Sequence, residues 1–332
     1  MYVTLFMDVE DPIALEADDI IQTCTDILTE EGVQATLCVV GEKARLLKQR
    51  GRQDIINAMK RHDIGFHSDL HSVHPTITEY LADKGWEEGV AEAIKREKPG
   101  VQAILDTYNL MPSCFAGPGN TWGPQICGAM EHLGIHAFVY AHTRIPEGGI
   151  HRFNGLTAYP YMGGLNDGNY QNDTEAERDR AALKQRLETA IEKGTYWHEV
   201  FLGHPTRILH EAYWDAANSG KGKQTPLEER VPAPRKSQAD LKKALVNFRK
   251  GSQLVRSIPG VEIRTIRQMN QTLAPLSHHN ISPAEQRAVW GEIEANLRTM
   301  PNWPILPEDL DVSRIVSTTH ERLFTLKRYE MK

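Results

Sequence analysis

The sequence predicts an α/β protein, built as a distorted (β/α)7-type barrel with a short helical C-terminal appendage. Two observations support this fold class. Apolar, β-branched segments alternate roughly seven times with segments of helical periodicity along residues 1–275. Polar and charged residues follow directly after several of the apolar segments, as they do at the strand ends of α/β enzymes. No repeat of 20 to 50 residues is found, so a solenoid is not expected.

The expected elements can be placed one by one. Strands are predicted where apolar and β-branched residues cluster, at 2–7, 33–40, 63–67, 114–115, 135–141, 195–204 and 261–266. Helices are predicted where apolar residues recur every three or four positions, at 17–32, 42–62, 86–110, 124–134, 175–194 and 241–258. Gly32 ends the first helix, since a glycine commonly follows the last helical residue, and Gly51 interrupts the second.

Two regions do not follow the alternation. Residues 211–237 are rich in lysine, glycine, proline and asparagine, which predicts a long surface loop. Residues 276–332 are polar, and Ser282 followed by Pro283 predicts the start of one helix there. We therefore expect a main domain of residues 1–275 and a polar, partly helical C-terminal extension of residues 276–332.

Composition excludes several classes of protein. The net charge of −6 and the lack of a Lys/Arg stripe argue against a nucleic-acid partner. No apolar run approaches the ~20 residues of a membrane helix, so no membrane partner is expected. The first residues lack the features of a signal peptide, which predicts a cytoplasmic protein with reduced, buried cysteines. The sequence leaves the oligomeric state open, including a homo-oligomer.

Candidate functional residues follow three of the predicted strands. Carboxylates follow the first strand, two histidines follow the third, and another histidine ends the strand at 195–204; they are Asp8, Glu10, Asp11, His67, His71 and His204. The carboxyl ends of parallel barrel strands share one face. We therefore expect these residues, which are distant in sequence, to converge.

The segment GFHSDLHSVHP contains His67, His71 and His74, spaced by four and three residues. Either spacing can aim two imidazoles at one point if the segment turns helically. Imidazole is a common metal ligand and also the usual acid or base near neutral pH. By themselves these residues leave open a metal site, a proton-transfer site and a polar turn.

Four segments resemble, in the same order, the motifs of the polysaccharide deacetylases, the NodB-homology carbohydrate esterases. They are FMDVED, GFHSDLH, FAGPG and FLGH, and VQATLCVVGE resembles a further family segment. The resemblance covers about residues 1–275, so it identifies that part as a catalytic domain and leaves the extension outside. The family's fold is a distorted barrel of about seven βα units, in agreement with the alternation of segments.

The resemblance implies a metal-dependent hydrolase of a non-peptide amide bond, typically an N-acetyl group on an amino sugar or polysaccharide. A divalent metal, zinc or another first-row ion, would be bound by the side chains of His67, His71 and either Glu10 or Asp11. Asp8 would be the catalytic base that takes a proton from the attacking water. His204 would be the general acid that protonates the leaving amine.

The remaining candidates face the expected substrate, a carbohydrate or a small amide. His74 is expected either to be structural or to face this substrate. The flat faces of Trp122 and Trp214 suit a sugar ring. Backbone N–H groups of the Pro-Gly loop would stabilise an oxyanion, and the loop positions assigned to the substrate are Pro118, Gly119 and Asn120.

The sequence differs from the family pattern in two places. Val9 follows Asp8 where the family has a second aspartate, so both Glu10 and Asp11 stay open as the ligand. Glu10 is favoured, because residues two apart on an extended chain share a face. The FAGPG segment lacks the family's arginine, which orients the base, and this favours a catalytically inactive carbohydrate-binding relative as one alternative. The missing signal peptide favours another, an amidohydrolase of cyclic imides or ureides.

Overall fold

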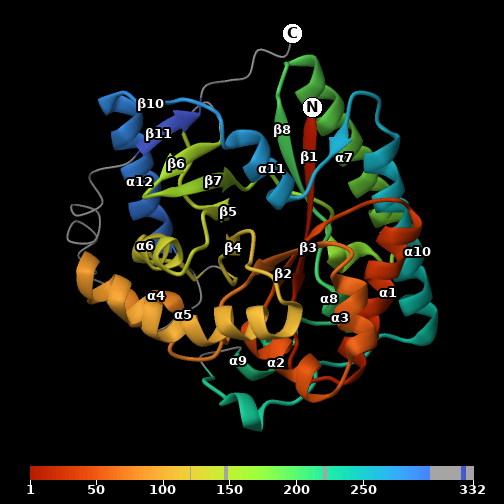
Figure 1. Ribbon diagram of the computed structural model, residues 1–332. Coiled ribbons are helices and arrows are strands. Elements are labelled where there is room, and N and C mark those ends of the chain that lie inside the picture. Colours follow the sequence, from red (N-terminus) through yellow and green to blue (C-terminus); the bar gives the residue numbers. More distant parts are fainter. Residues whose placement is uncertain (120, 146–148, 220–222, 300–322, 327–332) are drawn as a thin grey trace.

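The structure, a computed structural model, describes residues 1–119, 121–145, 149–219, 223–299 and 323–326. Parallel strands form its centre (Figure 1). In spatial order they are β8 (Trp197–Phe201), β1 (Tyr2–Val9), β2 (Thr36–Val39), β3 (Asp63–Phe66), β4 (Phe115–Ala116), β5 (Ala137–Ala141) and β7 (Leu156–Pro160). Every neighbouring pair in this series is parallel, which confirms the predicted fold class.

A backbone bridge brings the two ends of this series together. Gly164, just after β7, pairs in parallel with Phe201 of β8, and the N–H of Leu165 donates to the Phe201 carbonyl at 2.8 Å. A Cβ atom on Gly164 would lie 2.0 Å from that carbonyl oxygen, so only glycine permits the approach. The strands therefore curve into a distorted barrel.

Helices surround the strands (Figure 1). They are α1 (Glu16–Glu30), α2 (Gly41–Gln49), α3 (Gln53–Met59), α4 (Ile77–Leu81), α5 (Trp86–Tyr108), α6 (Gln125–His132), α7 (Asp173–Glu192), α8 (Pro205–Leu209), α9 (Ala216–Ser219), α10 (Gln238–Ser257), α11 (Ile266–Leu273) and α12 (Pro283–Thr299). The predicted helices are confirmed. Gly51 separates α2 from α3 because its backbone is left-handed, with φ of 67°.

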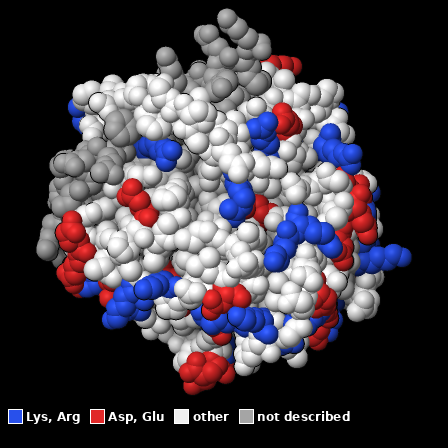
Figure 2. Space-filling model, in the orientation of Figure 1, with Lys and Arg blue, Asp and Glu red and all other residues white. Residues whose placement is uncertain are grey.

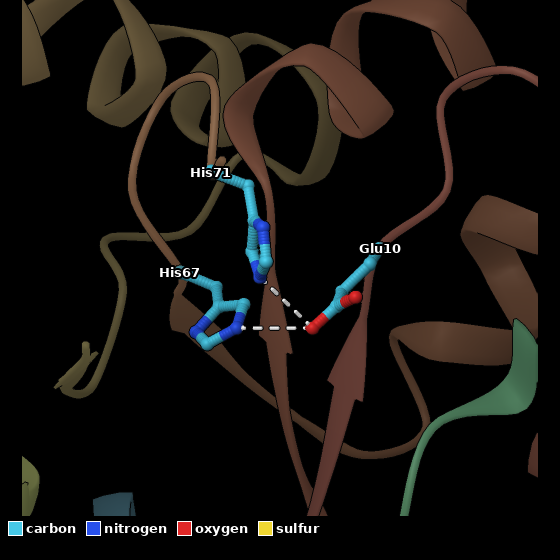
Figure 3. Close-up of side chains that lie close together, drawn as sticks. All are labelled: Glu10, His67 and His71. Carbon is cyan, nitrogen blue, oxygen red and sulfur yellow. Dashed lines mark ion pairs between the residues drawn. The ribbon is translucent and has the colours of Figure 1, made fainter. Parts of the chain in front are cut away.

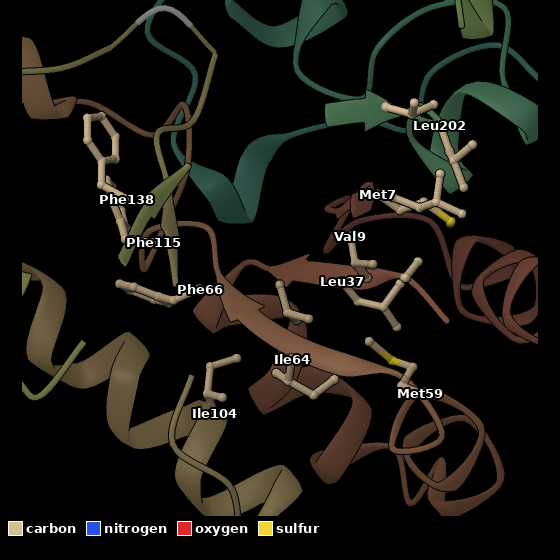
Figure 4. Packing of buried hydrophobic residues seen from close by; sticks show 14 of the residues in the cluster. Met7, Val9, Leu37, Met59, Ile64, Phe66, Ile104, Phe115, Phe138 and Leu202 are labelled. Carbon is tan, nitrogen blue, oxygen red and sulfur yellow. The ribbon is translucent and has the colours of Figure 1, made fainter. Parts of the chain in front are cut away.

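The barrel strands are mostly buried on both faces, which explains why apolar residues predominate in them. All residues of β1 from Val3 to Val9 are buried. Figure 4 shows how Val9 and Leu37 of neighbouring strands pack together, with Met59 of α3 and Ile104 of α5 nearby. This packing holds the strand ends, and hence the groups that follow them, in fixed positions.

One hairpin was not predicted. β6 (His151–Phe153) runs antiparallel to β7, and the turn between them is Asn154-Gly155, with φ of 46° and 84°. Asn-Gly is the preferred pair for a two-residue hairpin turn because both positions need positive φ. The predicted strand at 261–266 is short: β9 (Glu262–Ile263) pairs with the start of β1.

The described part of the C-terminal extension contacts the main domain. β10 (His278–Asn280) pairs with β11 (Leu323–Leu326), which in turn pairs with β6, all antiparallel. Val289 and Ile293 of α12 are fully buried in the core cluster that includes the barrel strands. The helix expected from Ser282-Pro283 is present, and the division of the chain at residue 275 stays a prediction.

The surface carries charges of both signs. On the face shown in Figure 2, lysines and arginines are interspersed with aspartates and glutamates, and neither sign forms a continuous patch. None of the described helices is both long and apolar enough to cross a membrane.

Candidate metal centre and active site

Side chains that follow β1, β3 and β8 meet at the carboxyl ends of these strands. Oε1 of Glu10 lies 3.3 Å from Nε2 of His67, 3.1 Å from Nε2 of His71 and 3.5 Å from Nε2 of His204. Figure 3 shows Glu10 pointing toward the two histidines of the 67–71 segment. Glu10, His67 and His71 are 5%, 1% and 7% exposed, so the cluster is shielded from water.

The backbone of the histidine segment aims both imidazoles at the carboxylate. The segment is a series of turns and not a helix, and Ser68 and His71 are left-handed, with φ of 60° and 56°. Nδ1 of His67 lies 3.0 Å from the carbonyl oxygen of Ala116, to which it can donate. That bond selects the tautomer whose Nε2 lone pair faces Glu10.

The donor set fits a divalent cation. Nε2 of His67 and Nε2 of His71 are buried and have no hydrogen-bond partner among the described residues, although both lie close to a carboxylate. One ligand atom each from Glu10, His67 and His71 lies within 4.8 Å of the others. Two imidazoles and one carboxylate suit zinc and other first-row metals and leave coordination positions for water and substrate.

The second oxygen of Glu10 is held by a residue from the loop at 211–237. Nε1 of Trp214 donates to Oε2 of Glu10 at 2.7 Å, and no part of Trp214 is exposed. The Arg230 guanidinium lies 5.2 Å from the centre of the Trp214 ring and donates to the Ser72 carbonyl at 2.9 Å. This loop, predicted to lie on the surface, therefore ties the carboxylate to the histidine segment.

The protonation state of Glu10 is set by its neighbours. Burial alone would raise the pKa of Glu10, but His71, His204 and His67 outweigh it and hold the pKa well below its usual range. The carboxylate is therefore ionised, as a metal ligand must be.

Asp8 lies on β1 beside the cluster, and it is 5% exposed. Its Oδ2 is 3.8 Å from Nε2 of His67 and 3.8 Å from Nε2 of His204. Its Oδ1 accepts a hydrogen bond from the Tyr140 hydroxyl at 3.3 Å. Burial raises the pKa of Asp8, and the two histidines partly offset this shift.

His204 is held by a carboxylate on the opposite side of its ring. Nδ1 of His204 lies 2.6 Å from Oδ2 of Asp167, which also accepts the backbone N–H of His204 at 2.9 Å. Burial would lower the pKa of His204, but the negative charges of Glu10, Asp167 and Asp8 outweigh it and raise the pKa to about 10. The ring is therefore a charged imidazolium whose Nε2 proton faces Asp8 and Glu10.

Comparison with known proteins gives matches among solved structures alone. No family model and no curated protein matches the chain. A Mycobacterium smegmatis protein assigned as a polysaccharide deacetylase matches with a TM-score of 0.51 and 14% identity, over 82% of this chain and 89% of that one. A family 4 acetyl xylan esterase from Clostridium thermocellum, solved with cobalt, gives 0.42 and 16%, over 82% and 92%. A CE4 family pseudoenzyme from Bacillus anthracis gives 0.41 and 13%, over 80% and 64%.

The chain has the polysaccharide deacetylase fold. This finding confirms the fold that the sequence motifs implied. Within that fold, the five residues brought together are those from three of the four motifs: Asp8, Glu10, His67, His71 and His204.

Asp11 of the first motif lies elsewhere. Its Oδ1 accepts the backbone N–H groups of Ile13 and Ala14 at 3.1 and 3.0 Å, and its Oδ2 accepts the Thr206 hydroxyl at 2.8 Å. With φ of 57°, its backbone turns the side chain toward the start of α1. Both oxygens are thus engaged in holding the polypeptide, and Asp11 does not join the histidines.

Two tryptophans differ from the sequence prediction. Trp122 is fully buried and stacks on Phe138, with ring centres 6.1 Å apart. Trp214 is equally buried and bonded to Glu10. Neither presents a flat face to a sugar in this structure, because both indoles are covered on all sides.

The other residues expected to face the substrate are His74, Pro118, Gly119 and Asn120. His74 lies beside Glu79, with Nδ1 2.8 Å from Oε2, and so helps to hold the start of α4. Pro118 is buried and its carbonyl accepts the Thr121 N–H at 3.1 Å, whereas Gly119 is exposed. Asn120 lies outside the described residues.

A buried carboxylate of α5, that of Glu97, accepts a hydrogen bond from the backbone of the histidine segment. Oε2 of Glu97 accepts the Asp69 N–H at 2.8 Å, and Oε1 accepts the Tyr80 hydroxyl at 3.0 Å. Burial, together with the nearby Asp69 charge, raises the pKa of Glu97 to about 7.

Sequence reasoning missed Asp167 and Tyr140, and it gave Trp214 another role. Asp167 lies in a short 3-10 turn, η1 (Asp167–Asn169), and Tyr140 lies within an apolar strand. The run Asn166-Asp167-Gly168 signals a turn, which was the one sign that a polar group stood near a strand end.

Proposed function

We propose that this protein is a metal-dependent hydrolase of non-peptide amide bonds, with an N-acetylated sugar or polysaccharide as substrate. The observation that carries the proposal is the position of Glu10, whose Oε1 lies within 3.5 Å of three histidine nitrogens. Asp8 lies beside this cluster, and the whole set stands at the carboxyl ends of barrel strands in a polysaccharide deacetylase fold.

Glu10, His67 and His71 would hold the cation, which we propose to be zinc or another first-row metal. Glu10 is the proposed carboxylate ligand, because the oxygens of Asp11 bond to backbone N–H groups and to Thr206. When bound, such a cation would polarise the amide carbonyl and make the attacking water more acidic.

Asp8 and His204 would move the protons. Asp8 lies outside the Glu10–His67–His71 group, although with Glu10 and His204 it forms a second group of ligand atoms within 4.8 Å of one another. We assign Asp8 to proton transfer because its Oδ2 faces His67 and His204, where it can accept a proton from the attacking water. Asp167 holds Nδ1 of His204, so Nε2 is the atom that gives its proton to the leaving amine. The amide C–N bond then breaks, leaving acetate and a free amine.

The exposed tyrosines near these groups suit a carbohydrate. Tyr213 is 41% exposed and its ring lies edge-on to His204 at 5.1 Å. Tyr161 is 44% exposed and its ring packs against Tyr140 at 5.9 Å. Aromatic faces of this kind pack well on sugar rings. The cytoplasmic location that the sequence analysis predicts remains part of this proposal.

Metal analysis combined with acetate release tests the proposal. We expect one divalent ion per chain and release of acetate from N-acetylated sugars or their oligomers, with cyclic imides and ureides included as the alternative substrates. Asp8→Asn should keep the metal and lose turnover. Asp83→Asn, at a side chain that is 82% exposed, is the matched control and should keep both the metal and the turnover.

Absence of stoichiometric metal after reconstitution would refute the metal centre. Loss of metal in Asp8→Asn would mean that Asp8 is a ligand. Turnover of cyclic imides or ureides without acetate release would move the substrate to the alternative class.

A further inference from the structure

Asp8 accepts a hydrogen bond from a tyrosine, Tyr140, that belongs to none of the sequence motifs. The described contacts of the Asp8 carboxylate involve His67 and His204 at Oδ2 and the Tyr140 hydroxyl at Oδ1. The FAGPG segment contains no lysine or arginine, so it supplies no cation to Asp8. The donor to Asp8 comes from a different strand, β5.

The backbone at Tyr140 is unusual for an aromatic residue. Its φ is 58°, in the left-handed region that bulky side chains rarely occupy. The pairing of β5 with β7 is irregular at the same place: Val139 faces Tyr159 and Ala141 faces Pro160, which leaves Tyr140 as an extra residue. A bulge of this kind redirects one side chain, and strained backbone tends to persist where function requires it.

The Tyr140 ring is held from three sides. It makes edge contacts with Phe6, Phe201 and Tyr161, with ring centres 5.5, 5.8 and 5.9 Å away. Burial and the nearby Asp8 charge raise the pKa of Tyr140 well above its usual value, so the hydroxyl keeps its proton and donates. The donor is therefore fixed in position and in protonation state.

We propose that Tyr140 is a positioning residue for the base: its hydroxyl holds Oδ1 of Asp8, so that Oδ2 faces the space between His67 and His204. This rests on the proposed function in so far as Asp8 is the base. The bulge in β5 and its strained backbone then exist to bring a phenol to the end of β1, where a regular strand would direct the side chain elsewhere.

Tyr140→Phe tests the role, because it removes one oxygen and keeps the ring. We expect kcat to fall roughly 10- to 100-fold, as for loss of a hydrogen bond to a charged group, with KM and metal affinity unchanged. Tyr159→Phe is the matched control: it removes a hydroxyl that donates to Asn270 at 2.9 Å from a tyrosine of the same packing cluster. It should lower stability and leave kcat unchanged.

A double-mutant cycle separates positioning from a general structural effect. If Tyr140 acts through Asp8, Tyr140→Phe should have little further effect on kcat in an Asp8→Ala background. Urea unfolding of the wild type, the two single variants and the double variant should also show coupling between the two sites. Unchanged kcat in Tyr140→Phe, or additive losses in the cycle, would overturn the proposal.

The unfolding cycle does not depend on the reaction. If the wild-type protein releases acetate from none of the substrates, it is the proposed function that fails. The coupling in the unfolding cycle still decides on the contact, and no coupling between Tyr140 and Asp8 would overturn it.

Discussion

Replacing Trp214 by phenylalanine should weaken metal binding without touching a ligand. The change removes the indole N–H that lies 2.7 Å from Oε2 of Glu10 and keeps an aromatic ring in the same buried place. A hydrogen bond to a charged acceptor contributes about 1.5–3 kcal/mol, and about 1.4 kcal/mol is a factor of ten. We therefore expect the metal dissociation constant to rise roughly 10- to 100-fold, the range found when a hydrogen-bond partner of a metal ligand is removed.

The assay is competition for the metal with a chromophoric chelator at constant pH, with urea unfolding to follow stability. Trp122→Phe is the matched control. Trp122 is also fully buried, but its Nε1 has no hydrogen-bond partner among the described residues. Both variants lose the same indole volume, whereas only Trp214→Phe loses a bond to Glu10.

Two results would refute this reasoning. Trp214→Phe could bind the metal as tightly as the wild type, which would mean that the indole does not hold Glu10. Alternatively, Trp122→Phe could lose as much affinity, which would mean that lost packing, and not the hydrogen bond, is the cause.

Three further predictions follow from the site. Glu10→Gln should lower metal affinity at least roughly tenfold, whereas Asp11→Asn should lower the melting temperature and keep the metal. Chelator competition measures the affinity and thermal unfolding the melting temperature. A larger loss of metal affinity in Asp11→Asn than in Glu10→Gln would make Asp11 the ligand. Asp167→Asn should lower kcat on an N-acetyl sugar by about 10²-fold or more. It should lower kcat on an activated anilide much less, since the amine that leaves from that substrate needs little protonation. Equal losses of kcat on the two substrates would mean that His204 is not the acid. Burial raises the pKa of Glu97 to about 7, so the contribution of Glu97 to stability should fall by about 3 kcal/mol as pH rises from 4.5 to 7. Glu97→Gln should therefore reduce the loss of stability over this range in urea unfolding by about that amount, and an unchanged pH dependence would contradict the prediction.

The convergence of Asp8, His67 and His204 could be predicted because it depends on strand direction alone. Each follows or ends an apolar run, and parallel strands in a barrel place all such ends on one face. The choice between Glu10 and Asp11 could be narrowed in the same way, since alternation along a strand puts Glu10 on the face of Asp8. It could not be settled, because the left-handed turn at Asp11 is visible only in the structure.

The groups that hold Glu10 and Asp8 could not be predicted. Trp214 reaches Glu10 from a loop that begins after α8, and Tyr140 reaches Asp8 because a bulge redirects it. Neither residue stands in a motif, and both contacts join residues more than a hundred positions apart. Contacts of this kind depend on loop and bulge geometry, which hydrophobic periodicity does not encode.

The hairpin of β6 and β7 is a different case. Its Asn154-Gly155 turn is a strong local signal that could have been read from the sequence. The pairing of β11 with β6 could not, because it joins residues far apart along the chain and leaves no local pattern.

The bridge between Gly164 and Phe201 is a much shorter strand pairing than the one between β1 and β8. β1 and β8 are paired along five residues, while the β7 side meets β8 at this bridge. A short junction of this kind opens more easily than a long strand pairing, so the amide protons of Leu165 and Phe201 should exchange with solvent by local opening, ahead of those in β1. His204 follows β8 on one side of that junction and Tyr161 follows β7 on the other, so an opening of the junction would also change the distance between these two side chains.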